Sequence, residues 1–480
     1  MAFTRRSFLK AAGAAGAACA AAGLARPRRA RAQRAFSAKH VVLLGIGGGL
    51  RRRESLGMAE GATLPNLFGN VPLVSGFGAG PAGAVKFAPE YLAMQPKLVT
   101  PPPLATPLYT QGALVTNLRY AAGAPGHLQG HATLISGAYN DLENRGDAHA
   151  PAPTLFELQR RQANTPATDA WYVSMVGGFY RTLQSSDHPE FGARFGGSFV
   201  SPPGAISEIL PLITSGKRSL ALKQTPDYPS VRASPDEAAA TRKLTAILDG
   251  NYPAYPKDGT FRATAAENAA LEDHLGRFYA DKTYRAYYPS QVGIGLQRGG
   301  GRIDATPDAL TIYHAEQILA RFKPGVMVVT LLDIDACHDD YNGYLRGQLV
   351  ADACARHLWE MIQSTDGLKD ETALFILPEH GRHLFANGQN PDSFGRAGID
   401  HGQGDDGDRD VWMLALGPDF KPGAVIDRTG VQQAGRTSGR WETIDATLTA
   451  ATLLGHGDVM TAGLQSLDQR PGLVVEDLLR

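Results

Sequence analysis

The sequence lacks the features that would indicate several large classes of protein. It has only three cysteines in 480 residues, which excludes a disulfide-rich scaffold, and no repeat of about 20–50 residues that would indicate a solenoid. No run of about 20 strongly apolar residues is present, so no transmembrane helix is expected. The 47 basic residues are balanced by 47 acidic ones. Without a basic excess, nucleic-acid binding is not expected either.

Basic residues are concentrated at the N-terminus, in the pattern of an export signal. Arg5 and Arg6 precede a weakly apolar run of alanine and glycine, and residues 30–32 (Ala-Arg-Ala) have the small-x-small pattern of a signal-peptidase site. We therefore predict a twin-arginine signal peptide over 1–32, with the twin-arginine translocase as partner; an ordinary secretory signal is the alternative. After cleavage, 40 basic against 47 acidic residues leave a charge of −7. This composition predicts a periplasmic or secreted protein without a membrane anchor.

Short apolar runs alternate with helical patterns along the rest of the chain. Several runs are apolar on both faces, which is typical of a parallel sheet covered by helices. The expected strands are 40–46, 113–117, 171–176, 326–332, 373–377 and 411–416. The expected helices are 152–162, 235–248, 264–279, 307–322, 345–362 and 443–454. We predict an α/β fold with a core over 33–177 and 302–480, and a helical insertion or cap over 178–301.

Carboxylates and imidazoles are concentrated in three short segments near the ends of these strands. Two segments directly follow the strands 326–332 and 373–377, and the third lies in a glycine-rich loop before the strand 411–416. The segments are 333–340, 378–383 and 398–402. An open α/β sheet binds its ligands at the carboxyl ends of its strands, so we expect these side chains to converge on a divalent metal, zinc or manganese. The candidate ligands are Asp333, Asp335, His338, Glu379, His380 and His401. His338 or His380 alone would more often be a hydrogen-bonded structural residue than a ligand; their joint occurrence around successive strands favours the metal interpretation.

The order of these motifs resembles the alkaline phosphatase and sulfatase superfamily. It is most similar to a domain-of-unknown-function branch whose members are often exported by the twin-arginine route. The corresponding segments here are, in chain order, Gly47–Gly49, Asp335–His338, Glu379–Arg382 and Asp400–Gly402. The resemblance covers most of 38–180 and 305–455. It implies a three-layer α/β core with a mostly parallel central sheet and a two-metal ester-hydrolase site.

The chain departs from the superfamily at two positions of that site. The resemblance implies a metal-binding aspartate after the first strand, where this chain has Gly47 or Gly48. It also implies a nucleophilic threonine, serine or modified cysteine four residues before His131, where His127 stands. Glu379 replaces the usual aspartate of an Asp-His pair. His127 and His131, if on one helical face, are therefore candidate catalytic residues or substitute ligands, and one ion is expected rather than two.

Two functions remain open at this level. The first is a metal-dependent hydrolase of small anionic phosphate, phosphonate or sulfate esters, in which water activated by the ion replaces the missing nucleophile. The second is a catalytically degenerate fold retained as a periplasmic or cell-surface binding protein. The cysteines left after cleavage, Cys337 and Cys354, form either one disulfide or two buried free thiols.

Overall fold

The computed structural model describes residues 36–57, 63–69, 73–74, 103–142, 148–176, 178–201, 296–298, 301–303, 306–338, 341–384, 398–402 and 406–480. The chain forms two compact units, Met1–Phe36 and Ser37–Arg480, and the fold below is that of the second. The signal peptide predicted over 1–32 and the helices predicted over 235–248 and 264–279 lie outside the described residues. Within the described ranges, none of the helices combines the length and apolarity that crossing a membrane requires.

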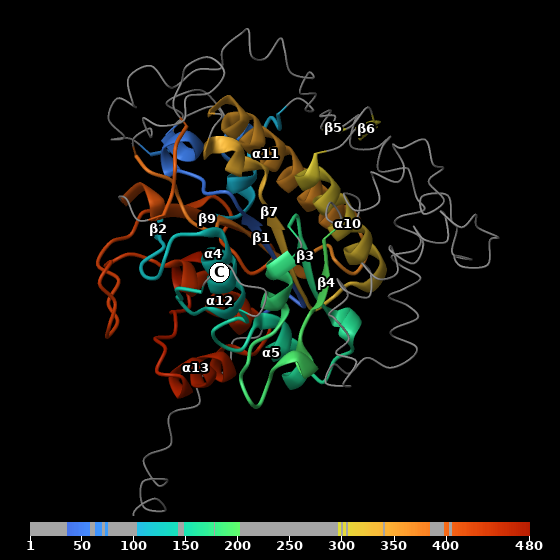
Figure 1. The fold of residues 1–480 in the computed structure, drawn as a ribbon, viewed down its shortest axis with the longest axis vertical. Coiled ribbons are helices and arrows are strands. Elements are labelled where there is room, and N and C mark those ends of the chain that lie inside the picture. The colour runs from blue at the N-terminus through green and yellow to red at the C-terminus, as the bar shows by residue number, and fades with distance from the viewer. Residues whose placement is uncertain are drawn as a thin grey trace, which may run out of the picture. The chain divides into compact units, whose positions relative to one another are not determined.

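An eight-stranded sheet forms the centre of the second unit (Figure 1). Its order is β10 (Ala424–Ile426), β2 (Ala113–Arg119), β9 (Asp410–Leu416), β8 (Thr372–Pro378), β1 (His40–Ile46), β7 (Val326–Leu331), β3 (Ala170–Ser174) and β4 (Ser198–Val200). Only β9 runs antiparallel to its neighbours. The sheet is mostly parallel, as predicted.

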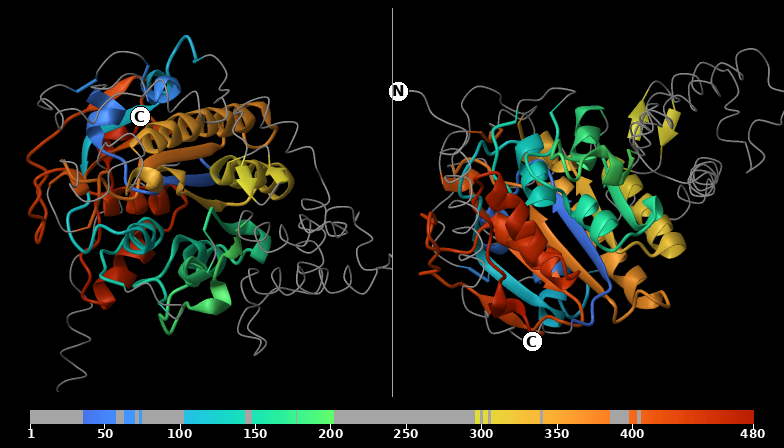
Figure 2. Two further views of the ribbon diagram at one scale, coloured as in Figure 1. Left: turned by 45° about the horizontal axis from the view of Figure 1, so that its top comes forward. Right: turned by 90° about the horizontal axis from the view of Figure 1, so that it is seen from below.

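Helices cover both faces of this sheet, as Figure 2 shows. On one face lie α10 (Pro307–Phe322) and α11 (Tyr341–Ser364), with the short α2 (Pro65–Phe68) against α11. On the other face lie α4 (His127–Ser136), α5 (Leu155–Gln162), α12 (Thr443–Leu453) and α13 (Gly457–Ser466). Because both faces are covered, the central strands are buried along nearly their whole length. The predicted α/β class with three layers is confirmed.

Local sequence signals explain where two of these helices begin. Thr306 accepts a hydrogen bond from Ala309 N (3.0 Å) and caps α10, with Pro307 at the first helical position. Thr154 forms a reciprocal capping box with Glu157, so α5 begins at Leu155 rather than at the predicted position 152.

Three observations bear on the predicted organisation of the chain. The short β4 pairs in parallel with β3 through Tyr172 and Phe199, so the core sheet extends beyond the predicted boundary at 177. Residues 296–298 and 301–303 form a separate two-stranded ladder, β5 and β6. Cys337 and Cys354 are buried free thiols, so the disulfide alternative is wrong.

Candidate metal centre

The candidate residues meet because several strands end at one edge of the sheet. β2 is parallel to β8, since both are antiparallel to β9, and β7 and β8 are both parallel to β1. The segments that follow these strands therefore leave the sheet at the same edge. In these segments α4 follows β2, the 3₁₀ helix Asp333–His338 follows β7, and Glu379 follows β8.

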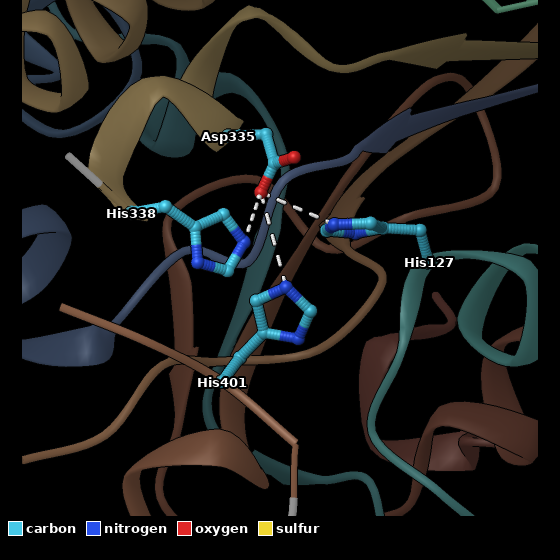
Figure 3. Close-up of side chains that lie close together, drawn as sticks. All are labelled: His127, Asp335, His338 and His401. Atoms are coloured by element: carbon cyan, nitrogen blue, oxygen red, sulfur yellow. Dashed lines mark ion pairs between the residues drawn. The ribbon is translucent and has the colours of Figure 1, made fainter.

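Four side chains from three distant parts of the chain converge there (Figure 3). We call His127, Asp335, His338 and His401 the Asp335 group. One carboxylate oxygen, Asp335 Oδ1, lies 3.1 Å from His127 Nε2, 3.1 Å from His338 Nε2 and 3.8 Å from His401 Nε2. All four potential ligand atoms lie within 4.8 Å of one another.

The three imidazoles of this group are oriented in the same way. In each ring, Nδ1 lies against an oxygen that can only accept a hydrogen bond, so Nδ1 donates and the Nε2 atom faces Asp335. The acceptors are Glu379 Oε1 for His127 (2.7 Å), Asp400 Oδ1 for His338 (2.5 Å) and the Pro125 carbonyl for His401 (3.1 Å). This arrangement is typical of metal-binding histidines.

The spacing of the Asp335 group fits a single ion. Zinc binds imidazole nitrogen and carboxylate oxygen at about 2.1 Å, and a tetrahedron of such bonds has edges of about 3.4 Å. The distances from Asp335 Oδ1 to the three imidazoles, 3.1–3.8 Å, bracket that value. The side chains of His338 and Asp335 are 36% and 30% exposed, so the group is open to solvent on their side.

The electrostatics of the group favour a cation. Burial opposes ionisation of Asp335, but hydrogen bonds from His127 and His338 outweigh it and hold the pKa of that carboxyl well below its usual range. Burial also opposes a charged His127, yet Glu379 outweighs it and raises the pKa of this imidazole to about 9. Burial, together with nearby positive charge, lowers the pKa of His401 to about 2. A bound cation would replace the proton that His127 otherwise carries.

A second cluster lies immediately behind the first and shares His127 with it. We call His127, His131, Glu379 and His380 the Glu379 group. Glu379 is fully buried, and its Oε1 accepts hydrogen bonds from His127 Nδ1 (2.7 Å) and Gly48 N (2.7 Å). His131 Nε2 lies 2.6 Å from Glu379 Oε2, and His380 Nε2 lies 3.3 Å from Oε1. His127 and His131 do lie on one face of α4 and meet the same carboxylate.

The end of β1 has no room for the carboxylate that the resemblance implies. A Cβ atom on Gly47 would lie 2.2 Å from the Leu331 carbonyl oxygen and 3.0 Å from His131 Nε2. A Cβ on Gly48, whose φ is +94°, would lie 2.4 Å from Asp335 N. Glycine is required at both positions because other chain segments approach the backbone too closely for a side chain.

Not every predicted ligand reaches the cluster, and some contributors were not predicted. Asp333 lies outside both groups; it accepts a hydrogen bond from Asp308 N (3.2 Å), and its burial raises its pKa to about 6. Arg382, noted only as part of a motif, donates to Asp335 Oδ1 (2.5 Å). The Pro125 carbonyl had no signal in the sequence, whereas Asp400 directly precedes His401 in the motif.

No family model and no curated protein sequence matches this chain. Similar solved structures include a protein of the alkaline phosphatase superfamily from Vibrio parahaemolyticus, at 11% identity over 88% of this chain and 67% of that chain, with a TM-score of 0.36. They also include the phosphonate monoester hydrolase of Silicibacter pomeroyi (15% identity, 90% and 75% covered, TM-score 0.35). A third is the alkaline phosphatase of the Antarctic bacterium TAB5 (13% identity, 88% and 99% covered, TM-score 0.38). Likenesses of this degree carry no argument about activity.

Proposed function

We propose that this chain is an exported member of the alkaline phosphatase and sulfatase superfamily that binds one divalent ion at the Asp335 group and hydrolyses phosphate or sulfate esters. The observation that carries the proposal is the convergence of three oriented imidazoles and one carboxylate at metal-ligand spacing. Zinc or manganese suits these donors. The order of the motifs along the chain supports the superfamily assignment.

Each residue of the site has a separate role in the proposed reaction. When bound, the ion would supply positive charge to polarise the ester and activate water. His338 and Asp335, the partly exposed members, lie where a substrate would enter. Arg382 fixes Asp335 by donating to its Oδ1 (2.5 Å). Because His127 stands where the superfamily has a hydroxyl or thiol, water is the nucleophile in this proposal.

The alternative is a binding protein on the same fold, and one observation favours it. Four protein ligands can complete a tetrahedral coordination, as in structural zinc sites, whereas catalytic sites leave a position open. The four atoms of the Asp335 group lie within 4.8 Å of one another, which permits such a closed arrangement. An ion without turnover would then stabilise the fold.

Elemental analysis and a substrate panel separate these functions. Protein purified without added metal should hold one ion per chain and turn over an aryl phosphate or an aryl sulfate. Chelator should abolish that activity and the ion restore it. His338→Ala should lose both ion and turnover, whereas His456→Ala, which removes an imidazole bonded to Gln159 outside the site, should keep both. An ion without turnover supports the binding protein; turnover without an ion rejects both proposals.

Export is proposed on the N-terminal sequence alone and has its own test. The exported protein should begin at or near Gln33. Replacing Arg5 and Arg6 together by lysine should leave the precursor inside the cell, because the translocase recognises the arginine pair. Cell fractionation and N-terminal sequencing measure both outcomes. Normal export of the double variant would leave the general secretory route as the explanation.

A further inference from the structure

We infer that the Glu379 group binds a second divalent ion, and that His127 lies between the two ions and binds one with each of its ring nitrogens. The inference goes beyond the single ion of the proposed function and rests on the binding of that ion at the Asp335 group. The second ion binds more weakly than the first, because His127 must give up a proton to accept it. Protein purified without added metal therefore holds one ion, and the second binds when Zn²⁺ is supplied.

Three potential ligand atoms of the Glu379 group lie at metal-ligand spacing. His127 Nδ1 is 2.7 Å from Glu379 Oε1 and 3.2 Å from His380 Nε2, and the latter two atoms are 3.3 Å apart. His380 Nδ1 lies 2.7 Å from the Gly381 carbonyl and donates to it, so the Nε2 lone pair faces the group. Two acceptors thus face the one proton that a neutral His127 carries at Nδ1. An ion in place of that proton would bind all three atoms.

Buried atoms without hydrogen-bond partners supply a fourth ligand. Within the described part of the chain, Glu379 Oε2 and His131 Nε2 are both buried and neither has a hydrogen-bond partner. They stand 2.6 Å apart without the geometry of a hydrogen bond. Unpaired buried polar atoms are costly, and an ion bound to both would pair them. A Cβ on Gly47 would lie 3.0 Å from His131 Nε2, so glycine at this position leaves the imidazole room beside the carboxylate.

His127 presents one nitrogen to each group. Its Nε2 lies 3.1 Å from Asp335 Oδ1, and its Nδ1 lies 2.7 Å from Glu379 Oε1. A neutral imidazole has one N–H and one nitrogen lone pair. Binding through both nitrogens therefore releases the Nδ1 proton to solvent and leaves a negatively charged ring between two cations. In the buried Glu379 group, this charge and that of the carboxylate offset the charge of the second ion.

The shared imidazole keeps the two ions too far apart to act together on one ester. Bonds of about 2.1 Å on the two nitrogens of one ring place the ions about 6 Å apart. Two-metal hydrolysis uses ions about 3.5–4 Å apart. His131, Glu379 and His380 are at most 1% exposed, so with His127 they form a closed four-coordinate site of the structural type. The second ion fixes His127 and adds positive charge behind the Asp335 group, and imidazole-rich donors favour Zn²⁺ or Cu²⁺.

The test counts the ions and measures the magnetic coupling between them. Zinc in the wild-type protein is determined as purified, and again after incubation with excess Zn²⁺ and gel filtration. Metal-free protein is loaded with one or two equivalents of Cu²⁺ for electron paramagnetic resonance. We expect zinc to rise from one ion per chain to two. The second Cu²⁺ should reduce the low-temperature signal instead of doubling it, because a shared imidazolate couples the spins of the two ions antiferromagnetically.

Single substitutions assign the ligands. His131→Ala should keep the first ion and lose the second, because His131 contacts Glu379 and not Asp335. His127→Ala should abolish the coupling, because it removes the only ring that the two groups share. His456→Ala is the matched control: its imidazole is bonded to Gln159 outside both groups, so two ions and their coupling should remain.

Each outcome decides the inference. One zinc ion per chain in excess Zn²⁺, lost in His338→Ala, would overturn it and leave the proposed function standing. Two ions whose Cu²⁺ signals simply add, or two ions still bound by His131→Ala, would also overturn it. Two coupled ions without ester turnover would support the inference and reject the hydrolase. If His131→Ala does not fold, the zinc count and the Cu²⁺ signal of the wild type still decide.

Discussion

The Asp335 group and the Glu379 group contain the same kinds of residue and share His127, yet their surroundings differ. Asp335 is partly exposed and stands 3.1–3.8 Å from three imidazoles. Glu379 is fully buried, with three imidazoles at 2.6–3.3 Å and one backbone N–H at 2.7 Å. Two groups built from the same kinds of residue thus differ in exposure and in spacing, although each contains a set of side chains with the geometry of a metal site.

The largest effect is expected from His401→Ala. Its Nε2 completes the Asp335 group, and burial lowers the pKa of this imidazole to about 2, so it is a neutral ligand across the working pH range. Zn²⁺ affinity should fall more than about 1,000-fold, and at an ion concentration of 1,000 times the wild-type Kd about 4 kcal/mol of stabilisation should be lost. Thermal unfolding with and without ion measures this. His456→Ala should keep the ion-dependent rise in Tm.

A second effect concerns two buried carboxylates with opposite pKa shifts. Burial opposes ionisation of Glu379, but the charges of His131 and His127 outweigh it and hold its pKa well below the usual range. Glu157 has no such cation, and burial raises its pKa to about 7 from 4.5. The folded state therefore holds the Glu157 proton more tightly than the unfolded state. Its contribution to stability is complete below about pH 4.5 and is lost as the pH rises through about 7.

Glu157→Gln removes this titration and should flatten the pH dependence. Between pH 4.5 and 7 the wild type should lose up to about 3 kcal/mol that the variant does not lose. Denaturant unfolding of both proteins at several pH values measures the contribution of Glu157 to the free energy of unfolding. A difference between the two proteins that stays constant with pH would show that Glu157 is ionised in the folded state.

A third effect is expected at Gly47, at the end of β1, where the structure leaves no room for a side chain. Gly47→Ala should destabilise the fold by about 1–3 kcal/mol, because its Cβ would lie 2.2 Å from the Leu331 carbonyl and the backbone must shift. Gly463→Ala is the control. Gly463 lies within α13, and a Cβ at this position would meet only Pro153, at 3.5 Å, so alanine should be neutral or stabilising. Gly47→Asp should destabilise as Gly47→Ala does without adding an ion to those of the wild type. An additional ion in Gly47→Asp would show that the strand end can open.

The sequence was sufficient for the strand positions and the edge where the site lies. Runs such as 326–332 and 373–377 are short and apolar on both faces, which is typical of a covered parallel sheet, and polar residues follow them directly. It was not sufficient for β4, because three residues give no periodic pattern. Nor could it give the distances within the site, since the 2.7 Å and 3.1 Å contacts of His127 depend on how α4 packs against two strand ends.

The smallest effect is expected at Asp333, which the sequence could not distinguish from Asp335. Both follow β7, two residues apart, but Asp333 turns towards α10 and accepts the Asp308 N–H, 3.2 Å away. Asp333→Asn should therefore leave Zn²⁺ affinity within about twofold of wild type, whereas Asp335→Asn should weaken it as severely as His401→Ala. Nor should stability fall, because desolvation opposes ionisation of Asp333 and its charge helps to raise the pKa of the buried Asp308, so an amide removes an unfavourable charge. Chelator competition on both variants measures the contrast. If Asp333→Asn instead abolished binding while Asp335→Asn preserved it, the ion would lie nearer α10 and the comparison between the two groups would fail.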